Sequence, residues 1–234
     1  MKKKPMILLT RQKGLNEADA LRFTQAGYEV SVCPLLTLRF LPIPKDVQKR
    51  LTQADWVLFT SQTPVPQIVP LLSEQTKIAV IGEKTAKAVC KLNREVDFIS
   101  PQETKRAFLA TFKEAYPQVG RVFYPKSQLA DDYIETQLQT TAKVTSQVTY
   151  LNLPAKDGLK HCSHLLQEKA IDGVYVTSPS AAKRFLAVVE ETGTTNQLLY
   201  FAIGATTQSY LAKRGIASHL ISELDQLKGI AKSC

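Results

Sequence analysis

No apolar run in this chain approaches the roughly 18 residues that a membrane-spanning helix requires. The sequence also lacks the GxxxxGK[ST] loop of phosphate-binding ATPases and has no GxGxxG turn after its first predicted strand. No GxSxG turn, which would mark a hydrolase serine, is present either. These absences argue against ATP or NAD as a cofactor and leave cofactor-free chemistry, or simple binding, as the functions to consider.

Cysteine and histidine are scarce, and neither forms a recognisable motif. His161 and His164 could share a helix face, but no carboxylate or well-placed thiol completes a metal-ligand set with them. The four cysteines are far apart: Cys33, Cys90, Cys162 and Cys234. This spacing favours reduced thiols over a disulfide framework, so we expect a cytoplasmic protein without a bound metal.

Acidic residues are outnumbered, with 21 Asp and Glu against 30 Lys and Arg, a net charge of +9. The basic excess is spread along the chain, and only Lys2, Lys3 and Lys4 form a run. Spread charge favours acidic small molecules over a dedicated nucleic-acid arm. Solubility alone would explain the same charge.

What the chain does contain is a regular alternation of short apolar runs with helix-like segments. Continuous Val, Ile, Leu and Phe runs such as Trp56–Phe59 are typical of strands buried on both faces. Strands of that kind, alternating with helices, predict α/β domains with parallel sheets. The predicted segments of most consequence are an extended stretch at 35–41, strands at 55–60, 121–124 and 143–150, and helices at 65–73, 130–140 and 223–232.

An internal repeat divides these elements into two sets. The stretch 6–32 resembles 121–147, and 55–86 resembles 172–208. We therefore predict two flavodoxin-like, doubly wound domains of five strands each, one inserted in the other as a circular permutation. The discontinuous domain comprises 1–34 and 153–234, the inserted domain 38–149, and two extended connections, 35–37 and 150–152, allow hinge motion.

Both copies of the repeat place small polar residues where strands end. Thr60-Ser61 and Thr177-Ser178 follow one strand of each domain, and Gly-x-x-Thr follows the next, ending at Thr85 and Thr207. Loops at the carboxyl ends of parallel strands bind ligands, and helix N-termini attract anions. Taken singly, each serine is better explained as an ordinary helix N-cap. The duplication favours an anion site, and we expect the four loops to face a shared cleft.

Two tyrosines stand out at predicted strand ends. Tyr124 lies beside Lys126, and Tyr150 ends the strand that leads back into the first domain. A phenol at such a position can donate a proton to a leaving oxygen. A packed tyrosine between domains is the alternative.

The order of these motifs resembles the uroporphyrinogen-III synthase family across nearly the full chain. The segments that carry the resemblance are LLTR (8–11), PLL (34–36), DWVLFTS (55–61), AVIGEKTA (79–86), Tyr150, VTSPSA (176–181) and AIGATTQ (202–208). The resemblance implies an enzyme that binds hydroxymethylbilane between two flavodoxin-like domains. It also implies loss of water, inversion of the last pyrrole ring (ring D) through a spiro intermediate, and closure of the macrocycle, as part of heme biosynthesis.

The resemblance assigns roles to particular residues. Tyr150 corresponds to the family tyrosine proposed to assist departure of the hydroxyl, which makes it the candidate catalytic residue. The substrate carries two carboxylates on every pyrrole, and the candidate residues for binding it are Arg11, Ser61, Thr63, Lys84, Thr85, Lys126, Ser178, Ser180, Thr206 and Thr207.

The chain departs from the family pattern at two places. Asp131-Asp132 occupy a place where members often have a basic residue, and Thr63 stands where some have arginine. Lys126 and Lys84 are the candidates to replace those cations.

The same resemblance implies no cofactor, a hydro-lyase reaction and a substrate supplied by hydroxymethylbilane synthase. We expect a monomer that binds neither nucleic acid nor membrane. A non-catalytic, hinged anion-binding module remains the main alternative, because fold alone does not separate it from an enzyme. A second alternative, a nucleic-acid binder, would need a basic face with exposed aromatic residues. The Lys and Arg residues of this chain are not interleaved with aromatic residues in that way.

Overall fold

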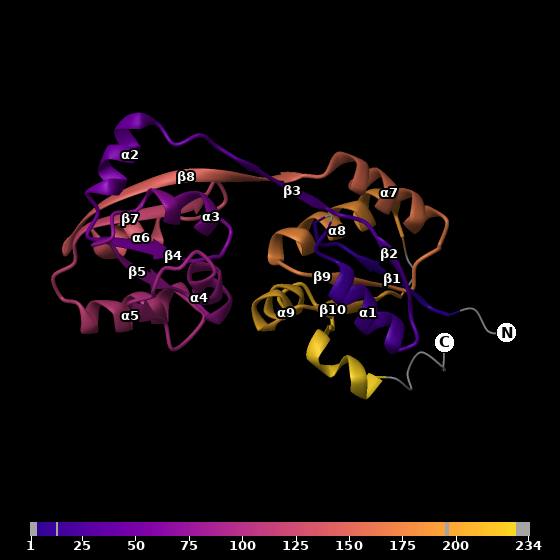
Figure 1. Ribbon diagram of the computed structural model, residues 1–234. Helices are drawn as coiled ribbons and strands as arrows, with labels where there is room; N and C mark the ends of the chain where they lie inside the picture. The colour runs from indigo at the N-terminus through magenta and orange to yellow at the C-terminus, as the bar shows by residue number, and fades with distance from the viewer. Residues whose placement is uncertain (1–3, 13, 195–196, 228–234) are drawn as a thin grey trace. The chain divides into compact units, whose positions relative to one another are not determined.

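The computed structural model describes residues 4–12, 14–194 and 197–227 (Figure 1). The chain divides into two compact units. Unit 1 comprises Met1–Thr37 and Leu153–Cys234, and unit 2 comprises Leu38–Asn152. The chain therefore passes between the units twice, once within strand β3 and once within strand β8.

Unit 1 is built on a five-stranded sheet in the order β11-β10-β9-β1-β2. Its strands pair in parallel, which confirms the predicted sheet type. Numbered within the unit, the order is 2-1-3-4-5, the flavodoxin-like arrangement. Its elements are β1 (Met6–Leu9), α1 (Glu17–Gln25), β2 (Glu29–Val32), α7 (Lys156–Gln167), β9 (Gly173–Val176), α8 (Pro179–Thr192), β10 (Leu199–Ala202), α9 (Ala205–Ala212), β11 (His219–Leu220) and the 3-10 helix η2 (Ile221–Leu227).

Unit 2 has a six-stranded sheet in the order β3-β8-β7-β4-β5-β6. Without β3, this is the order of unit 1 with the chain opened at a different loop, as the circular permutation predicts. Its strands are β3 (Leu36–Phe40), β4 (Trp56–Phe59), β5 (Lys77–Val80), β6 (Phe98–Ile99), β7 (Gly120–Ser127) and β8 (Ala142–Pro154). Its helices are α2 (Lys45–Thr52), α3 (Val65–Ile68), the 3-10 turn η1 (Val69–Leu71), α4 (Glu83–Cys90), α5 (Lys105–Ala115) and α6 (Tyr133–Leu138).

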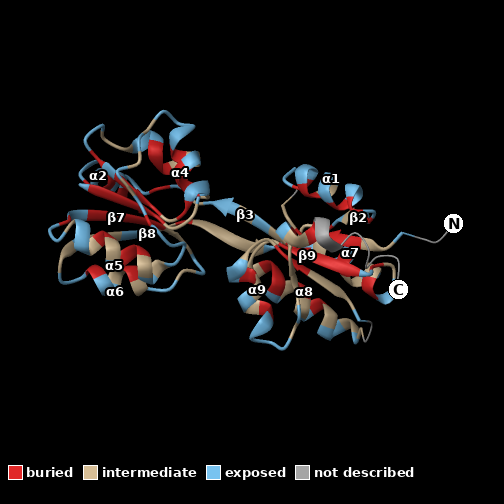
Figure 2. Cartoon of the chain, turned by 90° about the horizontal axis from the view of Figure 1, so that it is seen from below, coloured by how far each residue is buried: buried red, intermediate tan, exposed pale blue. Residues whose placement is uncertain are grey.

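Helices cover both faces of each sheet because the central strands are apolar on both sides. In β4, Val57 and Phe59 pack with α2, α3 and α4, whereas Trp56 and Leu58 pack with α5 and α6. In unit 1, α7, α8 and α9 cover one face, and α1 and η2 cover the other. Figure 2 shows the buried residues on the central strands and the exposed ones on the outer sides of the helices. Alternate side chains of a strand point to opposite faces, so each such strand joins two cores.

The structure corrects the predicted strands at the passage between units. The prediction of five strands for the second sheet was wrong, because 36–40 forms a sixth strand, β3, rather than a loose connection. The backbone N–H of Leu41 donates to the carbonyl of Thr149 at 2.9 Å. Residues 150–152 are likewise not a separate segment, because β8 continues through them to Pro154. Pairing with β3 satisfies backbone groups that would otherwise be open along the edge of β8.

Three predicted helices also differ from the structure. The helix expected at 65–73 is α-helical only to Ile68, because Pro70 lacks the N–H that continues a helix and its ring clashes with the preceding turn. The helix expected at 130–140 is shorter in the structure, where α6 runs only from Tyr133 to Leu138. The segment expected as a helix at 223–232 is the 3-10 helix η2 up to Leu227, and its remainder lies outside the described residues.

One close backbone contact in unit 1 fixes where α7 packs. A Cβ atom added to Gly158 would lie 1.7 Å from the carbonyl oxygen of Pro34, so only glycine fits there. The Cys33 thiol donates to the carbonyl of Gly158 at 2.8 Å. The first turn of α7 therefore rests directly on the segment that leads into β3.

Candidate functional site

The site in unit 2 begins where β4 ends. Thr60 and Ser61 follow directly, but α3 does not start until Val65, and its N-cap is Pro64. Ser61 therefore does not cap a helix, and the N-cap explanation that the sequence offered for this serine is wrong. Its Oγ lies 3.3 Å from the Oη of Tyr150, which makes a long hydrogen bond. The polar strand end and the candidate catalytic tyrosine are in direct contact.

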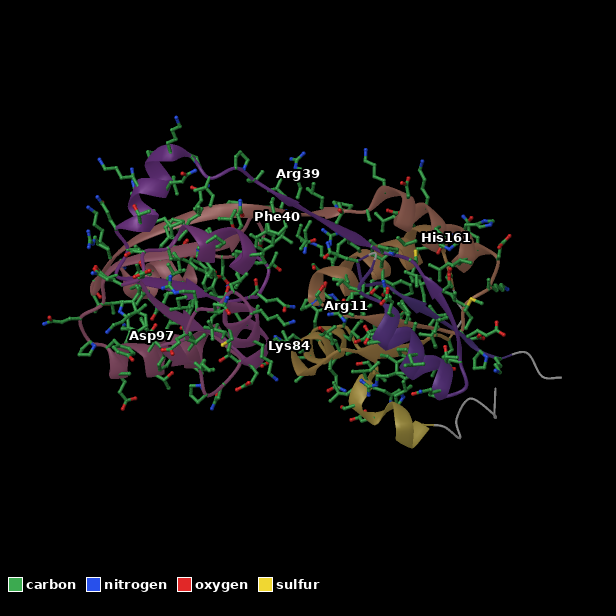
Figure 3. All side chains as sticks on the ribbon, viewed as in Figure 1. Arg11, Arg39, Phe40, Lys84, Asp97 and His161 are labelled. Carbon is green, nitrogen blue, oxygen red and sulfur yellow. The ribbon has the colours of Figure 1, made fainter. Side chains whose placement is uncertain are left out.

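Tyr150 is held by two neighbouring strands. It lies on β8 opposite Ser127 of β7, just past an irregularity in the pairing between Lys126 and Ser127. Its ring packs against that of Phe40 on β3, with 6.3 Å between ring centroids (Figure 3 labels Phe40). Tyr150 is half-buried. The sheet therefore fixes the ring of Tyr150 and leaves part of the side chain accessible.

A second tyrosine bonds to the residue before Ser61. The Oη of Tyr124 lies 3.5 Å from the Oγ1 of Thr60, and Tyr124 is fully buried. Burial raises the pKa of the Tyr124 phenol to about 12. Tyr124 accordingly stays protonated near neutral pH and serves as a packed hydrogen-bonding residue.

The candidate cation Lys126 is already paired. Its ammonium forms an ion pair with Glu135 of α6 and lies 5.8 Å from the ring centroid of Tyr124. Nearby, Lys105 forms an ion pair with Asp131, and its hydrogen bond lowers the pKa of that carboxyl group. The acidic residues near α6 thus engage lysines of unit 2 itself, which weakens the expectation that Lys126 replaces the missing cation.

The Gly-x-x-Thr segment of unit 2 forms the start of α4. Gly82 is the N-cap residue and has φ +77°, a backbone conformation that favours glycine. Lys84 is exposed on the first turn (Figure 3), whereas Thr85 is buried. Lys84 is the most exposed of the binding candidates in unit 2. Thr63 is half-buried in the turn before α3.

The matching edge of unit 1 is built differently. The Oγ of Ser178 accepts the backbone N–H of Ala181 at 3.1 Å, so Ser178 is a true N-cap of α8, followed by Pro179 at the first helical position. Ser180 lies 3.0 Å from Ser178, oxygen to oxygen. The two Thr-Ser turns therefore share a position but not a hydrogen-bonding role.

The remaining unit 1 candidates differ in exposure. Thr206 is exposed on the first turn of α9, and Thr207 is buried. Gly204 has φ −174°, which any residue adopts, so only Gly82 of the two loop glycines needs to be glycine for its φ. Arg11 follows β1 and forms an ion pair with Asp19 of α1 at 3.1 Å.

Comparison with known proteins identifies the family. The model of the family described as uroporphyrinogen-III synthase HemD matches residues 17–232. The chain belongs to the uroporphyrinogen-III synthase family. This confirms the resemblance inferred from the motifs.

Relatives of this family are similar over most of their length. The uroporphyrinogen-III synthase of Chlorobaculum parvum is 23% identical over 239 residues, covering 97% of this chain and 96% of the relative. A crystal structure of a mutant uroporphyrinogen III synthase from Thermus thermophilus superposes with a TM-score of 0.72 at 16% identity, covering 97% and 98% of the two chains. The Helicobacter pylori uroporphyrinogen-III synthetase gives 0.57 at 17% identity, covering 93% and 92%. The structural matches confirm the two-domain α/β fold.

Sequence reasoning missed two contributors to the Tyr150 environment. Phe40 was not predicted because 35–41 was interpreted as a connection, and only the pairing of β3 with β8 brings its ring to Tyr150. The bond from Thr60 to Tyr124 was also missed. Both tyrosines end predicted strands, as the Thr60-Ser61 pair does, and this shared position was a signal that could have revealed the bond.

Two structural features are not found in the described part of the chain. Within 4–12, 14–194 and 197–227, no cluster of three or more His, Cys, Asp or Glu side chains is arranged to hold a metal ion. In the same ranges, no helix combines the length and apolar character needed to cross a membrane.

The cap role of Ser178 leads to a first prediction. Replacing Ser178 with Ala should lower the free energy of unfolding by about 1 kcal/mol, because the N–H of Ala181 loses its acceptor. Ser61→Ala removes no cap, and water can replace its long contact with the half-buried Tyr150 phenol, so it should leave the free energy of unfolding within about 0.5 kcal/mol of the wild-type value. Urea denaturation of both variants tests the contrast. Equal losses in the two would contradict the different roles assigned to the two serines.

Proposed function

We propose that this protein is a uroporphyrinogen-III synthase that cyclises hydroxymethylbilane to uroporphyrinogen III, with loss of water and inversion of ring D. The observation that carries the proposal is the hydrogen-bonded pair of Tyr150 and Ser61 at the polar strand end of unit 2, in a chain of this family. The reaction needs a proton for the departing hydroxyl, and a half-buried phenol can supply it.

In the proposed step, Tyr150 acts as general acid. Its phenol proton goes to the hydroxyl of the terminal hydroxymethyl group, the carbon–oxygen bond breaks, and water leaves. Ring D attacks the resulting electrophilic carbon to give the spiro intermediate, and its bond to the neighbouring ring then breaks and re-forms at the other side of ring D, which closes the macrocycle. The proton that ring D loses on closure returns to the phenolate of Tyr150. Tyr124 does not take this role, because it is fully buried and bonds Thr60.

Binding of the bilane is proposed to use many weak polar contacts and one aromatic surface. Lys84 and Thr206 are exposed on first helical turns and suit carboxylates, because helix N-termini favour negative charge. Arg11 is part-exposed and keeps guanidinium nitrogens beyond the one that bonds Asp19. The ring of Phe40, 48% exposed beside Tyr150, can stack on a pyrrole.

The finer parts of the assignment belong to the same proposal. We propose a cofactor-free hydro-lyase, active as a monomer in the cytoplasm, whose substrate comes from hydroxymethylbilane synthase. Thr63, Lys126, Ser178 and Ser180 stay candidates for the polar surface around the substrate, whereas Thr85 and Thr207 are buried and would have to become exposed to join it. Of these, Lys126 already pairs with Glu135, and Ser178 accepts the Ala181 N–H while its own hydroxyl hydrogen can still be donated.

The proposal is tested by giving the purified protein hydroxymethylbilane and separating the product isomers. A synthase consumes the bilane faster than the enzyme-free reaction and yields the type III isomer. A hinged anion-binding module, the alternative, would bind the bilane and other polycarboxylates yet leave both the rate and the symmetric type I product of spontaneous closure unchanged.

A further inference from the structure

We propose that Ser61 is a positioning residue that donates its hydroxyl hydrogen to the phenol oxygen of Tyr150, rather than a ligand for a substrate carboxylate. This inference rests on the proposed function and deepens it, because it changes the role of a residue that the sequence assigned to binding. The carrying observation is the 3.3 Å separation of the two oxygens.

The local backbone leaves Ser61 free for this contact. In unit 1, the equivalent Ser178 uses its oxygen to accept the N–H of Ala181. In unit 2, the stretch from Ser61 to Pro64 is a turn, and the Pro64 N-cap of α3 receives no side-chain cap bond. The same Thr-Ser pair therefore caps a helix in one unit and reaches a tyrosine in the other.

The direction of the hydrogen bond is set by the chemistry of an acid. A phenol carries one hydrogen, and a general acid must aim that hydrogen at the leaving group. While Tyr150 aims its hydrogen at the leaving group, its oxygen can only accept the hydrogen bond from Ser61. A donor at that oxygen also stabilises the negative charge that develops as the proton leaves, so the contact strengthens in the transition state.

Neighbouring contacts hold both partners in place. Thr60, next to Ser61, is anchored to the buried Tyr124 at 3.5 Å, and the Tyr150 ring rests against Phe40. A reacting group whose position is fixed by packing and hydrogen bonding loses less entropy on the way to the transition state. Ser61 thus acts through Tyr150.

A double-mutant cycle with Ser61→Ala and Tyr150→Phe tests this role. Ser61→Ala alone should lower kcat about 10- to 100-fold with KM changed less than about twofold, as expected for losing a hydrogen bond to a developing charge. In the Tyr150→Phe background, the same change should lower kcat less than about twofold, because its partner oxygen is already gone. Ser61→Thr, which keeps a hydroxyl, should restore most of the activity.

Matched controls keep the result interpretable. Ser146→Ala removes a serine hydroxyl from β8 itself and should leave kcat unchanged. Fully additive losses in the cycle, or a rise in KM with normal kcat, would overturn the proposal and make Ser61 a substrate ligand. A wild-type kcat in Ser61→Ala would overturn it as well.

A measurement without substrate separates this proposal from the proposed function. In protein labelled with carbon-13 at tyrosine ζ-carbons, Ser61→Ala should move the Tyr150 resonance, assigned through Tyr150→Phe, and Ser146→Ala should not. An unmoved resonance overturns the Ser61 contact even if the protein is a synthase. A moved resonance in a protein that forms only type I product supports the contact and overturns the proposed function.

Discussion

Replacing Tyr150 with Phe is expected to lower kcat about 10²- to 10⁴-fold, the usual contribution of general acid assistance. The substitution removes only the phenol oxygen, so the ring can keep its packing against Phe40. Binding of the bilane is proposed to be spread over many carboxylate contacts, and KM should therefore change little. A loss in kcat without a rise in KM identifies an interaction made mainly in the transition state.

Tyr116→Phe is the matched control for this prediction. Tyr116 also lies in unit 2, but its ring packs on Trp56, the first residue of β4, at the opposite end of that strand from Ser61. Its loss of a phenol oxygen should leave kcat near the wild-type value. If Tyr150→Phe kept the wild-type rate and isomer ratio, Tyr150 would be only a packing residue.

Replacing Gly158 with Ala is expected to have the largest effect on stability, lowering the free energy of unfolding by roughly 3 kcal/mol. The new methyl group would lie 1.7 Å from the Pro34 carbonyl, and backbone atoms cannot turn aside as a flexible side chain can. Gly158 lies in the first turn of α7, where alanine is otherwise favoured over glycine by up to about 1 kcal/mol, so the net loss understates the cost of the clash. In a chain of this size we expect Tm to fall by about 10 °C.

Gly204→Ala provides the comparison, because the space around that Cβ position is open within 4 Å and its φ is −174°. Thermal and urea unfolding of the two variants should differ clearly, with Gly204→Ala, at the N-cap of α9, losing no more than about 1 kcal/mol. If Gly158→Ala unfolded like wild type, α7 would have to shift away from Pro34 without cost, and the close contact would not be a determinant of unit 1 packing.

The α/β fold could be predicted because its signals are local. Each central strand is a short, fully apolar run, and the repeat gives the permuted strand order directly. β3 was missed because Leu36–Phe40 is polar or exposed at several positions and becomes a strand only by pairing with β8. When two segments far apart in the chain pair as strands, the residues of each segment taken alone give little indication of that pairing.

The strand-end positions of the candidate residues could be predicted, but their hydrogen bonds could not. Duplication placed Ser61 and Ser178 at equivalent strand ends, yet one bonds Tyr150 and the other caps α8. The difference arises from the residues after each serine: Pro179 starts a helix at once, whereas the turn before Pro64 delays α3. Lys126 was expected to be available as a cation, and its pairing with Glu135 depends on the packing of α6.

The central claim, that this protein directs closure of hydroxymethylbilane, is tested most directly by the isomer composition of the product as protein concentration rises. Spontaneous closure competes with the catalysed reaction and gives the type I isomer. The proposed function predicts a type III fraction that rises with protein concentration towards the whole product, and that falls sharply when Tyr150→Phe replaces the wild-type protein at equal concentration. Type I product at every concentration of folded wild-type protein would contradict it.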